Sequence, residues 1–201
     1  MRYGLVVECT KGGPDAQVFE VLFRRFWPDH ALERPVTLST KPTVLSNCAD
    51  DVQLLLDGGC HRVIVAWDLH PAVWENHDPG PEDCVAECSQ VRQHLAVSKV
   101  DVSRVDLVCM VFELETLFLA DGAAVHAVIQ GTSVHVPERV NNGKPARICE
   151  PKTYLMKVFN KRGAQYTDSQ HAVQLAERVR LGRLRKCEPF RRLEKKLGPA
   201  R

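Results

Sequence analysis

The chain has 201 residues, of which 44% are hydrophobic and 26% are charged. This length and composition are typical of one folded globular domain and argue against a disordered chain. No apolar run approaches the roughly 20 residues needed to cross a bilayer. The apolar stretch after Met1 is too short for a secretory signal and ends at an acid, Glu8. We therefore expect a cytoplasmic protein without a membrane segment.

The net charge is only +2, but it is unevenly distributed. Residues 1–143 carry 20 acidic and 11 basic residues, which gives −9, whereas residues 144–201 carry 16 basic and 5 acidic residues, which gives +11. An acidic body followed by a basic segment favours an anionic partner such as nucleic acid.

Strand and helix patterns alternate along the first two thirds of the chain. Short, continuous apolar runs indicate strands buried on both faces, and apolar residues at helical spacing indicate amphipathic helices. In chain order, the pattern predicts a strand at 3–7, a helix at 15–26, a strand at 36–39, a helix at 42–57, a strand at 62–67, a helix at 82–97, a strand at 105–112 and a helix at 114–129, bent near Asp121. This alternation predicts an α/β fold with a mainly parallel sheet flanked by helices.

The last third has a different composition. Residues 130–151 are rich in Gly, Pro, Asn and basic side chains and are expected to form a long loop. Helices are predicted at 152–160, at 168–186 with Asp168 as N-cap, and at 188–197. We therefore expect a single domain with an α/β core at 1–129, the loop, and a basic helical extension at 152–201.

The eight cysteines are spread along the chain, and several lie inside apolar runs. This distribution favours buried, reduced thiols over a disulfide framework. His77, Cys84, Cys88 and His94 could form a zinc set, but the histidine spacings match no common zinc pattern. Core thiols and surface histidines are therefore the preferred interpretation.

An acid follows three of the predicted strands: Glu8, Asp68 and Glu113. The carboxyl ends of parallel strands lie at one edge of a sheet, where open α/β sheets bind their ligands. Converging carboxylates suit Mg²⁺, and a single acid at such a place can serve as a general base. The alternative is that these acids only cap helices and solvate loops.

Four segments resemble known families. Gly4-Leu5-Val6-Val7-Glu8 and the later Val63-Ile64-Val65-Ala66-Trp67-Asp68-Leu69-His70-Pro71 resemble the opening of Toprim-like domains. Phe112-Glu113-Leu114-Glu115-Thr116-Leu117-Phe118-Leu119-Ala120-Asp121 and Cys187-Glu188-Pro189-Phe190-Arg191-Arg192-Leu193 look like segments of the DUF4276 family of uncharacterised bacterial proteins, itself considered Toprim-like. The resemblance covers nearly the whole chain.

The resemblance implies a Toprim-like sheet and a metal-dependent nuclease or phosphotransfer protein that uses Mg²⁺ or Mn²⁺. Glu8 takes the acid–base role, and Asp68 takes the first position of a metal-binding D-x-D motif. The second position is His70, which suits Mn²⁺ or Zn²⁺ better than Mg²⁺. Glu113 and Glu115 are further candidate metal ligands. They would share a face on a strand but stand about 200° apart on a helix, and the resemblance centres on Glu115.

Basic residues are the candidates for contact with nucleic acid, although a solvated helical face would have the same composition. These candidates are Lys11, Arg139, Lys144, Arg147, Arg183, Arg185, Arg191 and Arg192. The resemblance also implies an ATPase partner and an effector role in bacterial anti-phage defence. The competing hypothesis, which His70 favours, is an inactive Toprim-like module that binds an ATPase or another copy of itself.

Overall fold

The computed structural model describes residues 1–11, 13–69, 81–110, 113–131 and 150–201. It divides into two units, Met1–Val111 and Phe112–Arg201, which are described separately. The boundary falls inside the stretch 1–129 that the sequence predicts as one α/β core.

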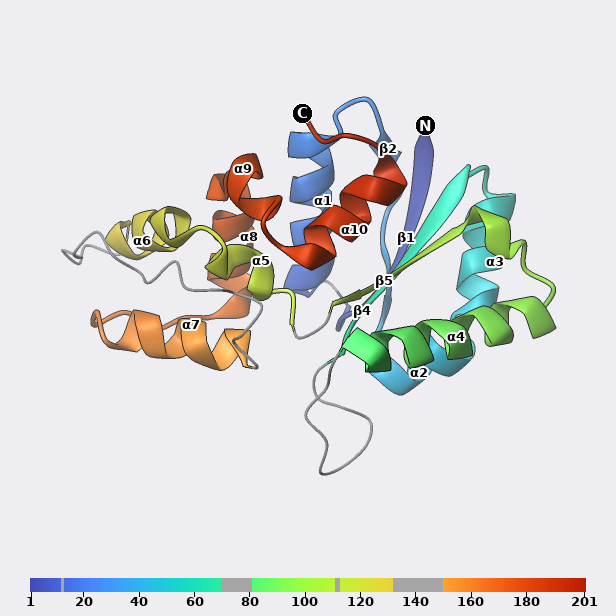
Figure 1. Cartoon of the computed structure of the whole chain (residues 1–201), viewed down its shortest axis with the longest axis horizontal. Helices are drawn as coiled ribbons and strands as arrows, with labels where there is room; N and C mark the ends of the chain where they lie inside the picture. Colours follow the sequence, from blue (N-terminus) through green and yellow to red (C-terminus); the bar gives the residue numbers. More distant parts are fainter. Residues whose placement is uncertain (12, 70–80, 111–112, 132–149) are drawn as a thin grey trace. The chain divides into compact units, whose positions relative to one another are not determined.

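A parallel sheet forms the centre of the first unit (Figure 1). Strand β1 (Arg2–Glu8) pairs on one side with β2 (Ala31–Leu32) and β3 (Val36–Leu38), and on the other side with β4 (Arg62–Asp68). Beyond β4 lies β5 (Val105–Met110), and every pair is parallel. The central strands are buried on both faces, as their continuous apolar runs require. The α/β class and the mainly parallel sheet are therefore confirmed.

Helices cover both faces of this sheet. Figure 1 shows α1 (Pro14–Phe26) on one face and α2 (Lys41–Asn47), α3 (Ala49–Asp57) and α4 (Pro81–Val97) on the other. The single helix predicted at 42–57 is interrupted at Cys48, which ends α2 and precedes α3. The helices α2 to α4 pack with the sheet into one apolar core.

The second unit is helical in its described part. It contains α5 (Thr116–Leu119), α6 (Gly122–Gln130), α7 (Pro151–Asn160), α8 (Asp168–Arg178), α9 (Leu181–Leu184) and α10 (Glu188–Leu197). Fully buried Phe118, Phe159 and Phe190 are among its largest core side chains. The prediction that Asp168 is the N-cap of α8 is wrong by one residue, because Thr167 holds that position and Asp168 lies in the first turn.

The bend expected near Asp121 is a break between two helices. Asp121 caps α6 by accepting a hydrogen bond from the Ala123 N–H at 3.2 Å. Its carboxylate also accepts bonds from Arg180, at 2.7 and 2.6 Å from the guanidinium and 3.0 Å from the backbone N–H. Burial by itself raises the pKa of the Asp121 carboxyl, but these hydrogen bonds from Arg180 outweigh it and hold the pKa below its usual value. The same contact ends the helix predicted at 168–186, which is divided into α8 and α9.

The prediction of reduced thiols is wrong for one pair. Cys84 of α4 and Cys109 of β5 form a disulfide, with their Cα atoms 5.7 Å apart. Packing of α4 against β5 brings the two together across 25 residues of sequence, a proximity that spacing alone does not indicate. The described cysteines outside this disulfide are Cys9, Cys48, Cys60, Cys88 and Cys187. Cys84 is therefore not available to the zinc set, and His77 lies outside the described residues.

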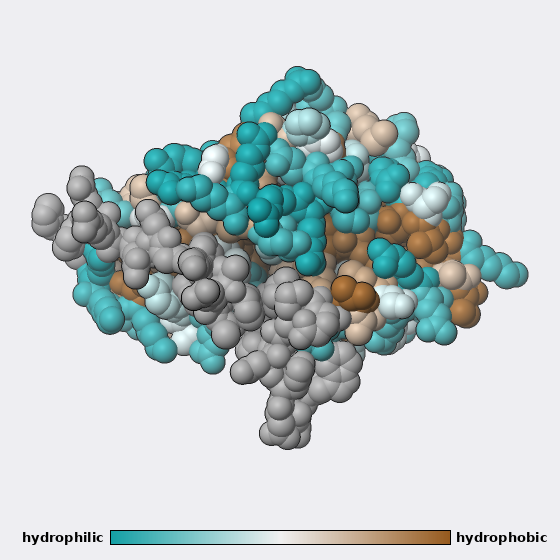
Figure 2. Space-filling model, in the orientation of Figure 1, coloured by the Kyte–Doolittle hydropathy of each residue, from teal (hydrophilic) through white to brown (hydrophobic). Residues whose placement is uncertain are grey.

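The face of the molecule drawn in Figure 2 is mainly hydrophilic, with smaller apolar areas. Large hydrophobic side chains that are exposed are Met1, Leu54, Val85, Val97 and Met156. Within the described part of the chain, we find no helix whose length and apolar character would allow it to cross a bilayer.

We predict that Asp121→Asn lowers the free energy of unfolding at pH 7 by about 1–3 kcal/mol, because the buried bonds from Arg180 lose a charged acceptor. The pKa of Asp121 is depressed in the folded state, so its contribution is present above the unfolded value of about 3.9 and is lost as the pH falls through the folded value. Urea unfolding should show a difference from wild type that shrinks in acid. Glu177→Gln, on an exposed position of α8, is the control. A pH-independent difference would contradict this account.

Candidate functional site

Glu8 ends β1 at the carboxyl edge of the sheet. The register pairs Val6 with Val65 and Val7 with Ala66, so the next residue along β1, Glu8, lies opposite Trp67. Residues paired in this way point to the same face, and Val6, Val65 and Trp67 belong to the core that α2 to α4 cover. The Glu8 side chain therefore belongs to the α2–α4 face of the sheet.

A buried lysine lies on this face. Lys41, the first residue of α2, is only 4% exposed and donates a hydrogen bond to the Leu69 carbonyl. Its ammonium forms an ion pair with the Glu87 carboxylate of α4 at 3.5 Å. Glu87 in turn accepts a hydrogen bond of 2.6 Å from the Trp67 indole N–H. We call Glu8, Lys41, Trp67 and Glu87 the strand-end cluster.

Two carboxyls of the strand-end cluster have raised pKa values. Burial raises the pKa of Glu8, and the Lys41 charge and the backbone N–H groups of Asp68 and Lys41 offset part of this rise. Burial likewise raises the pKa of Glu87, against the Trp67 hydrogen bond and the Lys41 charge. The Oε2 atom of Glu8 is buried and has no hydrogen-bond partner among the described residues. Glu8 therefore has both a proton affinity above that of a surface acid and an oxygen still able to accept a bond.

Asp68 is the last residue of β4 and is half-buried. Its backbone N–H stabilises the Glu8 carboxylate. By strand alternation, the Asp68 side chain follows Ala66 and belongs to the α1 face, opposite to that of Glu8. The structure thus brings together the Glu8 carboxylate and the Asp68 backbone, while their side chains leave the sheet from different faces. His70, the predicted third member, lies outside the described residues.

Glu113 and Glu115 lie in the second unit, beside Lys152. The Glu113 Oε2 accepts a hydrogen bond of 2.8 Å from the Lys152 backbone N–H, and Tyr166 donates one of 3.4 Å to Glu115. Burial opposes the charge of Lys152, but its ion pair with Asp168 and the charges of both glutamates raise its pKa overall. Glu115 is 7% exposed. A lysine therefore supplies the positive charge that both acids face within this unit.

The strand predicted to lead into Glu113 is described as β5 up to Met110, and residues 111–112 lie outside the described residues. Glu113 follows in irregular backbone, and Glu115 takes the N-cap position of α5 with helical dihedral angles. Glu113 and Glu115 therefore share neither a strand nor a continuous helix, the two alternatives considered from the sequence.

The predicted nucleic-acid contacts divide into three groups. Arg185 makes hydrogen bonds of 3.0 and 2.7 Å to Glu194, and Arg192 pairs with Glu188 one helical turn away. Arg183 and exposed Arg191 make no ion pair with another described residue. Lys11 is exposed beside the carboxyl end of β1. Three further candidates lie outside the described residues: Arg139, Lys144 and Arg147.

The described residues contain no group of three His, Cys, Asp or Glu side chains placed to hold a metal ion. Mg²⁺ commonly binds through only one or two protein carboxylates, with waters and substrate phosphates completing its shell. Glu8, with its buried unpartnered oxygen, and Asp68 at the neighbouring strand end supply hard oxygen atoms of this kind. Each acid has the donor chemistry for Mg²⁺ or Mn²⁺, but their side chains leave the sheet from opposite faces, so the two carboxylates do not form one shared site.

Lys41 and Glu87 are not among the residues predicted from the sequence. Glu87 shares a face of α4 with Cys84, Val91 and Leu95, all of which are buried. Glu87 therefore interrupts an apolar stripe of α4 at helical spacing. A charged residue in such a position indicates a buried ion pair, and this pattern could have identified Glu87 from the sequence. Nothing in the sequence identifies Lys41 as its partner across 46 positions, because the contact depends on how α2 and α4 pack.

Together these features define an α/β protein with a polar cluster at the carboxyl edge of a parallel sheet. The family model described as a domain of unknown function, DUF4276, matches residues 15–198. The chain belongs to this family, as the sequence predicts. The match begins within α1, so that Glu8 precedes it and Asp68, Glu113 and Glu115 lie inside it. No curated protein and no solved structure matches the chain.

We predict that Lys41→Met lowers the free energy of unfolding at pH 7 by about 3–5 kcal/mol, because the Glu87 carboxylate stays buried without its cation. In this variant the folded pKa of Glu87 rises further above the unfolded value of about 4.3. The loss should therefore be small near pH 4 and grow as the pH rises towards the folded pKa. Urea unfolding at several pH values measures this trend.

The double variant Lys41→Met with Glu87→Gln is the matched control, because it removes both charges. It should recover much of the stability lost in the single variant. If the double variant is as unstable as the sum of the two single variants, the ion pair is not what holds α2 and α4 together.

Proposed function

We propose that the protein is a divalent-metal-dependent nuclease, or a related phosphotransfer protein of the Toprim type. The proposal rests on the environment of Glu8. It combines a strand-end position, a raised pKa, and an oxygen without a hydrogen-bond partner among the described residues. An acid with these properties is suited to general acid–base catalysis near neutral pH.

In this proposal the Glu8 carboxylate takes a proton from the attacking water, or returns one to the leaving oxygen. Lys41 is a positioning residue, because its ammonium is buried against Glu87 and the Leu69 carbonyl. Its charge keeps the Glu8 pKa from rising as far as burial alone would raise it. A base whose pKa lies too high would remain protonated and inactive at neutral pH.

Asp68, at the end of β4, is the described residue of this unit that would hold the metal, while Glu8 keeps the acid–base role. A bound Mg²⁺ or Mn²⁺ would neutralise charge on the phosphate and lower the pKa of a bound water. His70, Glu113 and Glu115 remain candidates for additional ligands on the strength of the family resemblance.

A second candidate function is a non-catalytic module that binds a partner, such as an ATPase. The observation that favours it is Lys41, which brings a fixed positive charge of the protein itself into the strand-end cluster. The charge of its carboxylates is then compensated in part without a metal ion.

The test is incubation of the purified protein with plasmid, linear DNA and RNA in Mg²⁺ or Mn²⁺. We expect metal-dependent cleavage that falls by about 10²–10⁴-fold in Glu8→Gln, the range typical of a lost acid–base residue. Asp68→Asn should require a higher metal concentration to reach half of its maximal cleavage rate. Asp57→Asn, an exposed acid at the end of α3, should leave the rate unchanged.

Cleavage that persists in both Glu8→Gln and Asp68→Asn would contradict the proposed site. Absence of cleavage by the wild type with either metal would instead favour the binding module.

The basic helix α10 gives a separate prediction. Arg191 and Lys195 are exposed one turn apart, whereas Arg185 is engaged by Glu194. We predict that Arg191→Gln weakens binding to duplex DNA and lowers the slope of log affinity against log salt by about 0.9, the value for one lost phosphate contact. Arg185→Gln, a change of equal charge, should lower thermal stability and leave that slope unchanged. Equal slopes for wild type and Arg191→Gln would exclude this helix from the nucleic-acid surface.

A further inference from the structure

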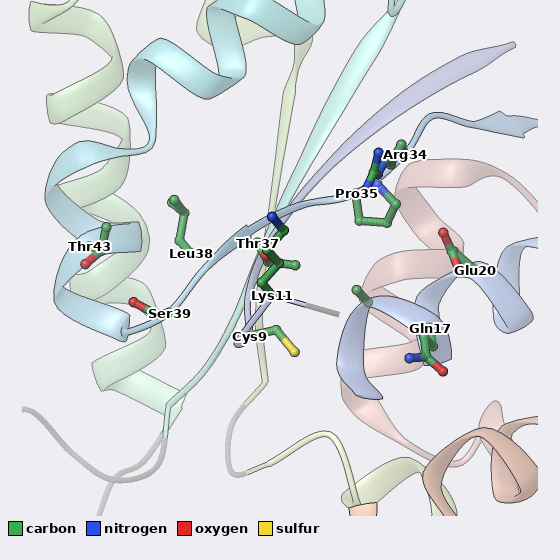
Figure 3. Close-up of a pocket in the computed structure, with 11 residues that line it drawn as sticks. Cys9, Lys11, Gln17, Glu20, Arg34, Pro35, Thr37, Leu38, Ser39 and Thr43 are labelled. Carbon is green, nitrogen blue, oxygen red and sulfur yellow. The ribbon is translucent and has the colours of Figure 1, made fainter. Parts of the chain in front are cut away.

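A cavity of about 600 Å³ opens at the edge of the sheet beside β3 (Figure 3). Its walls come from the end of β1 and the loop after it, from α1, and from β3 with the start of α2. Its polar lining includes Lys11, Glu20, Arg34, Thr37, Ser39 and Thr43. We call this cavity the β3 pocket.

The β3 pocket carries two positive charges that no described side chain pairs with. Lys11 and Arg34 are both exposed, and neither forms a hydrogen bond or ion pair with another described side chain. One acid, Glu20 of α1, also lines the pocket, so two cations face one carboxylate. An anionic ligand would gain charge-assisted hydrogen bonds here without displacing an internal partner.

The remaining lining suits a phosphate attached to a larger group. The hydroxyl groups of Thr37, Ser39 and Thr43 can each donate to a phosphate oxygen. Pro35 and Leu38 add apolar wall area, and the volume lies within the range of about 300–1,000 Å³ usual for small-molecule sites. The pocket is therefore large enough for a nucleoside phosphate rather than only for an inorganic ion.

The pocket adjoins the strand-end cluster through the backbone. Leu38 of β3 is paired in register with Glu8, and the N–H of Cys9 donates to the Leu38 carbonyl at 2.9 Å. Both Cys9 and Leu38 line the pocket. The pocket therefore begins one residue after Glu8 along the chain, although Glu8 itself is not part of its lining.

A tight turn fixes the loop that carries Lys11. The Gly13 N–H donates to the Thr10 carbonyl at 2.7 Å. A Cβ atom on Gly13 would lie 2.2 Å from the Cys9 sulfur, so only glycine fits at this position. The turn therefore returns the chain directly into α1 and leaves Lys11 at the wall of the pocket.

We propose that the β3 pocket binds a nucleotide of the substrate strand, with Lys11 and Arg34 on its phosphate and the three hydroxyl groups beside them. This inference rests on the proposed function, because it assigns a nucleotide subsite to the same edge of the sheet. The strand would run from the pocket past the end of β1, which places the neighbouring phosphodiester bond near Glu8.

The test measures binding separately from cleavage. Affinity for a fluorescently labelled single-stranded hexanucleotide is measured by anisotropy in EDTA, over a series of salt concentrations. A nucleoside monophosphate serves as competitor and distinguishes a free nucleotide from a strand as the ligand. The variant is Lys11→Gln with Arg34→Gln. The matched control is Arg92→Gln with Lys99→Gln, which removes two exposed cations of α4 and the turn after it.

We expect the pocket variant to weaken binding about tenfold or more, because two charge-assisted contacts are lost. The slope of log affinity against log salt should fall by about 1.4, the value for two phosphate contacts on a single strand. The control should stay within about twofold of wild type, since its cations are not at the pocket.

Wild-type affinity and slope in the pocket variant would overturn the proposal, and so would absence of binding by the wild type at low salt. Pocket-dependent binding without cleavage would support the subsite and contradict the nuclease. Cleavage that depends on Glu8, together with binding that is unchanged in the pocket variant, would support the nuclease and contradict the subsite.

Discussion

The buried ammonium of Lys41 is the interaction on which the carboxyl edge of the first unit depends. A charge that is 4% exposed is tolerated only when it is paired and hydrogen-bonded. Glu87 and the Leu69 carbonyl meet that requirement, and they tie α2 to α4 and to the chain leaving β4. The charge of the same ammonium lowers the pKa of the Glu8 carboxyl. Lys41 therefore contributes both to the packing of the unit and to the acidity of its candidate catalytic residue.

This coupling also explains why Glu8 stands apart from the other strand-end acids. Burial raises the pKa of Glu8, whereas the Lys41 charge and two backbone N–H groups favour the carboxylate and oppose part of that rise. Asp68 contributes its backbone to Glu8, and its side chain follows the opposite face of the sheet. Glu113 and Glu115 face Lys152 in their own unit. In both units, a lysine therefore places a positive charge near the candidate acids.

Local sequence patterns predicted the elements of the fold well. The central strands and α1, α4, α7 and α10 were found to within about two residues, because burial on both faces and helical periodicity are properties of neighbouring residues. The helix breaks at Cys48 and near Val179 were missed. The second break depends on Arg180, which bonds to Asp121 59 positions away. The Cys84–Cys109 disulfide and the Lys41–Glu87 pair were missed for the same reason, since both arise from packing between distant segments.

The candidate site could be predicted only in part. Glu8 and Asp68 were identified from their strand-end positions, but the face to which each side chain belongs required the register between β1 and β4. The β3 pocket could not be predicted from the sequence, because Arg34 and Thr43 line the same pocket as Lys11 only through the pairing of β3 with β1. From the sequence, Lys11 is identified only as one of the basic candidates for contact with nucleic acid.

The most direct test of this account is an NMR titration of the Glu8 side-chain carboxyl in the wild type and in Lys41→Met. The account predicts a wild-type pKa above the usual glutamate value and a further rise when the lysine is removed. A pKa at or below the usual value, unchanged by Lys41→Met, would contradict the link between the buried lysine and the candidate catalytic acid.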